Sequence, residues 1–210
     1  MTQDNCVFCD KNVIREGLLG ETENFYVRAN AIGTMAPGHL MVISKKHYSC
    51  FGALPKDLDE EYTALIKKVK EKVENKFSTP ILTEQGVHKQ SIKHAHIHFL
   101  PSVSERYSFS DKKFIDLIPQ EIKIEFGKGI LGIRKVVEED GEYVSIQEDG
   151  KLYICRTKGY NGKFGPIRQF VPELIGLTKL LDWQKMSAEE LERDKKWVKK
   201  TIDSLEGRVC

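Results

Sequence analysis

The sequence contains no apolar run long enough to span a bilayer, so nothing in it indicates a membrane-spanning segment. Its 33 basic and 31 acidic side chains nearly cancel, and it therefore lacks the strong field of a protein that binds nucleic acid or a membrane surface by charge. The first ten residues, MTQDNCVFCD, lack the charged and apolar regions of a signal peptide. We expect a cytoplasmic protein.

Cysteine is scarce, with five residues in 210, and the number is odd. This count argues against a framework of disulfides and favours reduced thiols. The sequence also has no internal repeat and no low-complexity linker. With 40% hydrophobic and 30% charged residues, the chain can bury one good core, as one domain with a large extension or as two small domains.

The apolar pattern of the first half predicts a sheet and one long helix. Strands are expected at 25–28, 39–43, 79–84 and 92–100, separated by loops that contain glycine or proline. An amphipathic helix is expected from Asp57 to about Lys76, because apolar residues recur there at helical spacing. These residues are Leu58, Tyr62, Leu65, Ile66, Val69 and Val73.

The character of the chain changes near residue 101, where a polar, loop-like segment begins. Beyond it, Asp-Gly turns at Asp140 and Asp149 separate β-rich runs, which predicts a small antiparallel meander. Ser187 and Glu190 form the capping box of a terminal helix. That helix is expected to bury one face, made of Leu191, Val198, Ile202 and Leu205. We therefore expect a first domain at 1–105 and a C-terminal α+β extension at 106–210.

Three of the six histidines stand at alternate positions in KHAHIHFLP, residues 93–101. On a strand, His94, His96 and His98 project to one side while Ala95, Ile97 and Phe99 pack into the core. An expression tag would be terminal and contiguous, unlike this run. Clustered groups that titrate near neutrality suit a metal site, or acid, base and nucleophile chemistry.

The run resembles the His-φ-His-φ-His-φ-φ signature (φ, hydrophobic) of the histidine triad (HIT) hydrolases and transferases, and it matches at every position. Other motifs that resemble the family are, in chain order, PGHLMVI at 37–43, KKH at 45–47, TEQG at 83–86 and QSI at 90–92. The resemblance covers about residues 5–101. It implies an α+β fold in which an antiparallel sheet packs against a helix.

A Cys-x-x-Cys pair stands at Cys6 and Cys9. Alone this pair is a weak signal, and two reduced thiols near a terminus explain it equally well. A thioredoxin-like redox site would need a preceding strand, and only five residues precede Cys6. The resemblance to zinc-containing HIT proteins implies that Cys6, Cys9, His47 and His94 bind one structural zinc ion, as a closed four-ligand set.

The resemblance assigns His96 as the nucleophile that attacks the α-phosphorus of a nucleotide. A neutral imidazole is a good nucleophile at pH 7, provided that its other nitrogen donates a hydrogen bond, for example to a backbone carbonyl. The resemblance also implies that His98 and His39 bond the phosphoryl oxygens, and that Gln90 and Ser91 place the bridging oxygen and the leaving group.

Six other residues are interpreted one by one. His39, considered alone, would be interpreted as a buried structural histidine, but its Gly-His context favours a functional role. His88 has no family counterpart and is interpreted as an ordinary loop histidine. Asn30 is the nearest candidate for a contact with the ribose hydroxyls. An apolar slot for the base, or simply core, is expected from Phe25, Tyr26 and Ile43.

The third triad residue favours hydrolysis, because transferase branches of the family resemble His-x-His-x-Gln. We expect cleavage at the α-phosphate of a dinucleoside polyphosphate or a nucleoside phosphoramidate. The alternatives are a nucleotidyltransferase or phosphorylase, and a zinc-stabilised nucleotide-binding protein with little turnover. The chain could form a homodimer, although the C-terminal extension could occupy the surface that would form the dimer interface. A basic lid for polyphosphate, or a solvated loop, is expected at Arg156, Lys158, Lys163 and Arg168.

Overall fold

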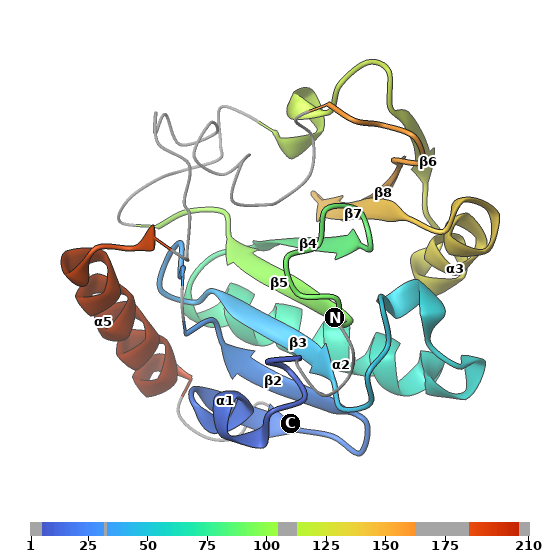
Figure 1. The fold of residues 1–210 in the computed structure, drawn as a ribbon. Helices are drawn as coiled ribbons and strands as arrows, with labels where there is room; N and C mark the ends of the chain where they lie inside the picture. The colour runs from blue at the N-terminus through green and yellow to red at the C-terminus, as the bar shows by residue number, and fades with distance from the viewer. Residues whose placement is uncertain (1–5, 32, 105–112, 163–184, 206–210) are drawn as a thin grey trace.

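The computed structural model describes residues 6–31, 33–104, 113–162 and 185–205. One antiparallel sheet of eight strands, in the order β1-β2-β3-β5-β4-β7-β8-β6, runs through the molecule (Figure 1). Its strands are β1 (Leu18–Glu21), β2 (Phe25–Ala29), β3 (Leu40–Ser44), β4 (Pro80–Gly86), β5 (His96–Pro101), β6 (Lys123–Phe126), β7 (Tyr143–Glu148) and β8 (Lys151–Arg156). The expected α+β fold with an antiparallel sheet is confirmed.

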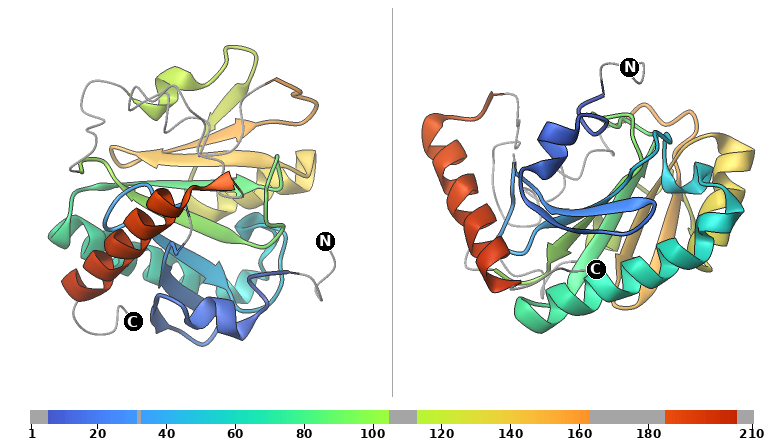
Figure 2. Two further views of the ribbon diagram at one scale, coloured as in Figure 1. Left: turned by 60° about the vertical axis from the view of Figure 1, so that its left-hand side comes forward. Right: turned by 90° about the horizontal axis from the view of Figure 1, so that it is seen from below.

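The helices are α1 (Lys11–Arg15), α2 (Asp59–Lys76), α3 (Gly129–Asp140) and α5 (Ala188–Ser204), with short 3-10 turns η2 (Phe51–Ala53), η3 (Lys56–Leu58) and η4 (Phe114–Leu117). Figure 2 shows α2 lying along one face of the sheet and α1 on the opposite side. No helix in the described part of the chain combines the length and the apolar character needed to cross a membrane.

Helix α2 forms where the helical periodicity predicts it. Its buried face carries Tyr62, Leu65, Val69 and Val73, which pack in the main core against the sheet. Three acidic side chains in its first turn and Lys76 in its last turn complement the helix dipole. The prediction of an amphipathic helix is confirmed, with η3 occupying residues 56–58 ahead of it.

The sheet continues from the first half of the chain into the second. Strand β4 pairs with β5 on one side and with β7 on the other, from Leu82↔Gln147 to Gly86↔Tyr143. Without β7, β4 would be an edge strand with unpaired backbone groups. The predicted division into domains at 1–105 and 106–210 therefore separates strands that share one sheet, and it stays a prediction. The predicted homodimer also stays a prediction.

The expected meander is wrong in its first part, because residues 129–140 form α3 rather than a strand. The apolar residues Ile130, Ile133 and Val136 recur at helical spacing and are buried. Gly141, with φ of 80°, ends this helix in the left-handed conformation, and its N–H bonds the Val137 carbonyl. The second Asp-Gly turn, at Asp149, is confirmed as the hairpin between β7 and β8.

Helix α5 begins at the expected capping box of Ser187 and Glu190. Its expected apolar face is only partly correct, because Leu191 and Ile202 are both 39% exposed. The residues buried instead are Asp194 and Thr201. The reason is that this face meets backbone N–H groups of the loop before β3, and polar side chains satisfy those donors.

Candidate active site and metal centre

His96 and His98 occupy one face of the sheet, as predicted. Strand β5 lies between β3 and β4, and its register sets His96 beside Ile43 and His98 beside Met41 and Thr83. The strand begins at His96, four residues later than expected, so His94 lies in the segment just before it. All three triad histidines are buried.

The imidazole of His96 is oriented by the backbone. Its Nδ1 lies 2.6 Å from the carbonyl oxygen of His94, so this nitrogen carries the proton and donates it. The lone pair of a neutral ring is then on Nε2. Phe8 packs against the ring, with centroids 5.0 Å apart. Sequence reasoning missed Phe8, because nothing in the Cys-x-x-Cys motif distinguishes an aromatic between the cysteines.

A chain of hydrogen bonds orients the imidazole of His98, the second catalytic candidate. His39 Nδ1 accepts the backbone N–H of Met35 and lies 3.2 Å from the Asn30 amide nitrogen. Its Nε2 lies 3.0 Å from His98 Nδ1. Because Nδ1 of His39 accepts, its Nε2 donates to His98 when both rings are neutral, and His98 then carries its own proton on Nε2.

Asn30, the expected ribose contact, is buried beneath the loop that precedes β3. Its amide nitrogen donates to the Gly33 carbonyl and approaches His39. The side chain of Thr34 donates to the Asn30 carbonyl. The structure thus gives Asn30 a role in orienting His39, and its contact with ribose stays a prediction.

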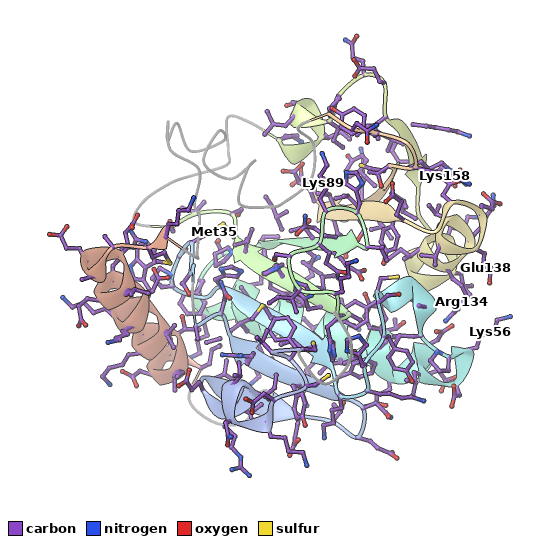
Figure 3. The ribbon with its side chains drawn as sticks, in the orientation of Figure 1. Met35, Lys56, Lys89, Arg134, Glu138 and Lys158 are labelled. Atoms are coloured by element: carbon purple, nitrogen blue, oxygen red, sulfur yellow. The ribbon has the colours of Figure 1, made fainter. Side chains whose placement is uncertain are left out.

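The segment between β4 and β5 carries the other expected substrate contacts and includes Lys89, labelled in Figure 3. Val87 and Lys89 have φ of 75° and 48°, which is unfavourable backbone for side chains of these types. Gln90 donates from Nε2 to the His94 carbonyl, while its buried Oε1 has no hydrogen-bond partner in the structure. Ser91 is exposed.

His88 differs from an ordinary loop histidine, because it is only 3% exposed. Its Nδ1 lies 3.3 Å from Glu142 Oε1, in the segment just before β7. The segment that leads to the triad is therefore in contact with the second half of the chain.

Of the three residues expected to form an apolar slot for the nucleotide base, one does not lie on the histidine face. Phe25 packs with Phe51 and Tyr62 on the face of the sheet opposite the histidines, so it is core. Tyr26 pairs with Ile43, which in turn pairs with His96, and these side chains share the histidine face.

Arg156, which was expected to belong to a basic lid for polyphosphate, is instead engaged within the protein. Its guanidinium is bonded to three carboxylates, those of Glu125, Glu139 and Asp140, and this contact raises its pKa. Lys158 donates to the Glu139 carbonyl. Lys163 and Arg168 lie outside the described residues.

The four residues expected to hold a metal ion come together. Ligand atoms of Cys6, Cys9, His47 and His94 all lie within 4.8 Å of one another. The sulfur of Cys6 is 3.4 Å from His94 Nδ1, and that of Cys9 is 3.4 Å from His47 Nδ1 and 3.6 Å from His94 Nδ1. His94 Nε2 lies 2.7 Å from the Ser44 carbonyl, which leaves Nδ1 as its ligand atom.

Burial shifts the pKa values of two of these ligands toward their neutral forms. Burial, and then the neighbouring thiol of Cys6, raise the pKa of Cys9 to about 11. Burial lowers the pKa of His94, with His47 contributing in the same direction. A bound cation would convert both thiols to thiolates and would keep both imidazoles neutral.

Comparison with known proteins agrees with this geometry. Residues 11–105 match the family model described as the HIT domain. No curated protein matches the sequence. The residues that the HIT model matches include His94 and the strand β5, which carries His96 and His98.

Several solved structures are similar to this chain. One is a hypothetical histidine triad nucleotide-binding protein from Sulfolobus tokodaii, 18% identical over 95% of this chain and 93% of that one, with a TM-score of 0.42. A HIT family hydrolase from Clostridium thermocellum is 27% identical over 50% and 96%, with a TM-score of 0.40. A zinc-bound histidine triad family protein from Mycobacterium smegmatis is 21% identical over 48% and 76%, with a TM-score of 0.39.

Proposed function

We propose that the protein hydrolyses a nucleotide conjugate at its α-phosphate, through a nucleotidyl-histidine intermediate on His96. The observation that carries the proposal is the contact between His96 Nδ1 and the His94 carbonyl. It holds the ring in the tautomer whose Nε2 lone pair can attack phosphorus. The conjugate is a dinucleoside polyphosphate or a nucleoside phosphoramidate.

In the first step, the Nε2 lone pair of His96 forms a bond to the α-phosphorus, and the bond from phosphorus to the leaving group breaks. The leaving group departs with that electron pair and takes up a proton. In the second step, a water oxygen attacks the same phosphorus, the P–N bond breaks, and the nucleotide is released while the water proton passes to solvent or to a neighbouring base.

His98 and His39 support the charge that develops on the phosphoryl oxygens. The chain from Asn30 through His39 to His98 leaves an N–H on His98 Nε2, which is the donor that this role needs. Because the third triad residue is histidine rather than glutamine, hydrolysis is favoured over transfer to phosphate or a sugar phosphate.

A structural zinc ion fits the Cys2His2 cluster. With Zn–S of about 2.3 Å and Zn–N of about 2.0 Å, tetrahedral geometry places sulfur and nitrogen ligands about 3.5 Å apart. The shortest sulfur-to-nitrogen contacts, 3.4 and 3.6 Å, agree with that value. The ion would neutralise two thiolates. Cys6, Cys9, His47 and His94 would fix the N-terminal segment to the end of β5 where the triad begins.

The four cysteines that the structure describes are unpaired, as a reducing cytoplasm would keep them. This supports the cytoplasmic location as part of the proposal.

The test combines turnover with covalent trapping. A panel of dinucleoside polyphosphates and nucleoside phosphoramidates, labelled on the α-phosphate, is incubated with the wild type, His96→Ala and His98→Gln. We expect His96→Ala to lose about three orders of magnitude in kcat and all covalent label, while it still binds nucleotide. We expect His98→Gln to become labelled but to release the nucleotide slowly.

Two results would contradict the mechanism. One is near-normal turnover by His96→Ala, and the other is label recovered on His98. Nucleotide binding by the wild type without turnover or label on any conjugate would favour the alternative of a binding protein.

A further inference from the structure

We infer that Glu142 is a positioning residue for the proposed reaction and that it acts through His88. Glu142 lies just before β7, outside the residues that the HIT model matches. Its Oε1 is 3.3 Å from Nδ1 of His88, which belongs to the segment between β4 and β5. The known HIT motifs give His88 no counterpart. The inference rests on the proposed function and extends it to the second half of the chain.

The backbone on either side of His88 is strained. Val87 and Lys89 have φ of 75° and 48°, in the left-handed region that side chains of these types rarely adopt. Val87 is branched at Cβ, which makes this conformation less favourable still. A strained backbone persists only where surrounding groups hold it, and such strain is concentrated at functional sites. The segment therefore needs contacts from outside itself to keep its shape.

Contacts from the second half of the chain hold this segment. Val87 forms an isolated parallel bridge with Tyr143, at the start of β7. Lys89, labelled in Figure 3, donates from Nζ to the carbonyl of Gly162. Both strained residues are therefore tied to parts of the chain that the HIT model does not match.

The contact between His88 and Glu142 differs from these two, because it joins a buried side chain to a charged one. His88 is only 3% exposed, and the centroid of its ring lies 6.5 Å from that of Tyr160. When Nδ1 of an imidazole donates to a carboxylate, the hydrogen bond is charge-assisted and stronger than one between neutral groups. Glu142 keeps 29% of its side chain exposed, so its replacement leaves no large cavity. The contact can therefore be removed from the Glu142 side without disrupting the core.

The strained segment leads to the carbonyl that orients the nucleophile. The backbone N–H of Gln90 donates to the Val87 carbonyl at 3.4 Å, so the shape of the segment sets the position of Gln90. Gln90 Nε2 in turn donates to the His94 carbonyl at 3.2 Å, and the same oxygen accepts from His96 Nδ1 at 2.6 Å. His94 precedes β5, so its carbonyl lies outside the paired part of the sheet. A displacement of the segment would therefore reach His96 through one shared acceptor.

The experiment compares Glu142→Ala, Glu142→Gln, His88→Ala and the double alanine variant with a matched control, Glu125→Ala. The side chain of Glu125 is 27% exposed and pairs with Arg156, but it lies on β6, four strands from β5. Each variant is measured for thermal unfolding, and for kcat and KM with the conjugate that the wild type cleaves best. The ¹⁵N resonances of the imidazoles report the tautomer of His96, which is assigned by comparison with His96→Ala.

We expect Glu142→Ala and Glu125→Ala to lower the melting temperature by similar amounts, about 2 to 4 °C. Glu142→Ala alone should also lower kcat by about 5- to 30-fold with KM within about twofold, because it removes no contact with the substrate. Its His96 should show both neutral tautomers, whereas the wild type should show only the form protonated at Nδ1.

Two further variants test whether Glu142 acts through His88. Glu142→Gln keeps an oxygen that accepts from Nδ1 of His88, so it should retain about half of kcat or more. The double alanine variant should lose no more of kcat than the more damaging single variant, because both substitutions remove the same contact.

A purely structural contact would give a different result. Glu142→Ala would then melt earlier but keep kcat within about twofold of the wild type and a single tautomer at His96, which overturns the inference while the proposed function stands. Losses of kcat that multiply in the double variant would overturn it as well, because the two residues would then act independently. If the wild type cleaves no conjugate, the proposed function fails and this inference fails with it.

Discussion

The two halves of the molecule contribute differently to the candidate site. Residues 6–104 supply the triad and the metal cluster, whereas residues 113–205 supply side chains that bond Thr34 and Glu84 of the first half. Glu142 contacts His88, and Tyr143 bonds Glu84. The segment around β4 that leads to the triad is therefore in contact with the half that the family model does not cover.

The interactions between the two halves are ion pairs in one region and single hydrogen bonds in another. Near α2, Arg134 of α3 makes a two-pronged ion pair with Asp59 and bonds the Leu54 carbonyl, as Figure 3 helps to locate. Near the triad, the contacts are single hydrogen bonds to buried groups. We expect variants at the first half's own metal cluster to have the largest effects, and variants at the contacts between halves to have smaller ones.

The largest effect is expected from replacing Cys6 and Cys9 together with serine. Loss of the thiolates should abolish zinc binding and lower the free energy of unfolding by about 5 kcal/mol or more, because metal binding energy contributes directly to folding. Elemental analysis and thermal unfolding, with and without a chelator, measure both effects. Cys155→Ala is the control, since Cys155 is buried outside the cluster. Undiminished zinc in the double variant would exclude this ligand set.

The second largest effect is expected in the pH dependence of folding stability. It arises at Glu84, where β4 of the first half contacts Tyr143 of the second half. Burial raises the pKa of Glu84 from 4.5 to about 7, although hydrogen bonds from Tyr143 and Phe51 act in the opposite direction. The groups that face it, Tyr62, Cys50 and Tyr143, are neutral at these pH values and have raised pKa values themselves. No cation among the described groups offsets the charge of an ionised Glu84.

The direction in which stability changes with pH follows from proton binding by Glu84. Between pH 4.5 and about 7 the folded protein binds this proton more tightly than the unfolded chain, so stability from this group is full below pH 4.5 and falls as pH rises to about 7. At about 1.4 kcal/mol per pKa unit the loss is about 3 kcal/mol. In urea unfolding from pH 4 to 8, Glu84→Gln should remove this slope. An unchanged slope would mean that Glu84 ionises as readily in the folded chain.

Local pattern predicted the parts of the site that lie close together in sequence. The alternation of His94, His96 and His98 required only strand geometry, and α2 required only helical periodicity. The metal cluster spans 88 residues from Cys6 to His94, and the family motifs, rather than the physics of the chain, allowed its prediction.

Contacts set by tertiary structure were not predictable in this way. Residues 129–140 carry two local signals, apolar stretches that suit a strand and a helical spacing at Ile130, Ile133 and Val136, and their packing against η2 selects the helix. The pairing of β7 with β4, and the burial of Asp194 on α5, depend on long-range contacts that no local pattern encodes.

A smaller effect is expected from Tyr143→Phe. The variant keeps the ring, which packs against Gly86, but removes the hydroxyl that donates to Glu84. A buried carboxyl oxygen would lose its partner, which should cost about 1 to 3 kcal/mol in urea unfolding. Tyr153→Phe on β8 is the control, because β7 separates β8 from β4, which carries Glu84. Equal stability of the two variants would argue against a coupling between the halves at Glu84.

The smallest effect is expected where α5 meets the loop that carries His39. Asp194 accepts the Thr34 backbone N–H at 2.9 Å, and the Thr201 hydroxyl accepts that of Gly38 at 2.8 Å. Asp194→Ala should cost about 1 kcal/mol and lower kcat by about 3- to 10-fold with little change in KM, because the loop would hold His39 less firmly.

Asp194→Asn retains an oxygen that can accept from Thr34 and should therefore restore most of kcat, whereas Asp203→Ala, which removes an exposed ion pair with Lys199 on the same helix, should leave kcat unchanged. Rescue by asparagine separates the hydrogen bond from the charge. If Asp194→Ala lost stability without any loss of kcat, α5 would stabilise the fold without positioning His39, and the second half would support the active site only through β7 and the segment before it.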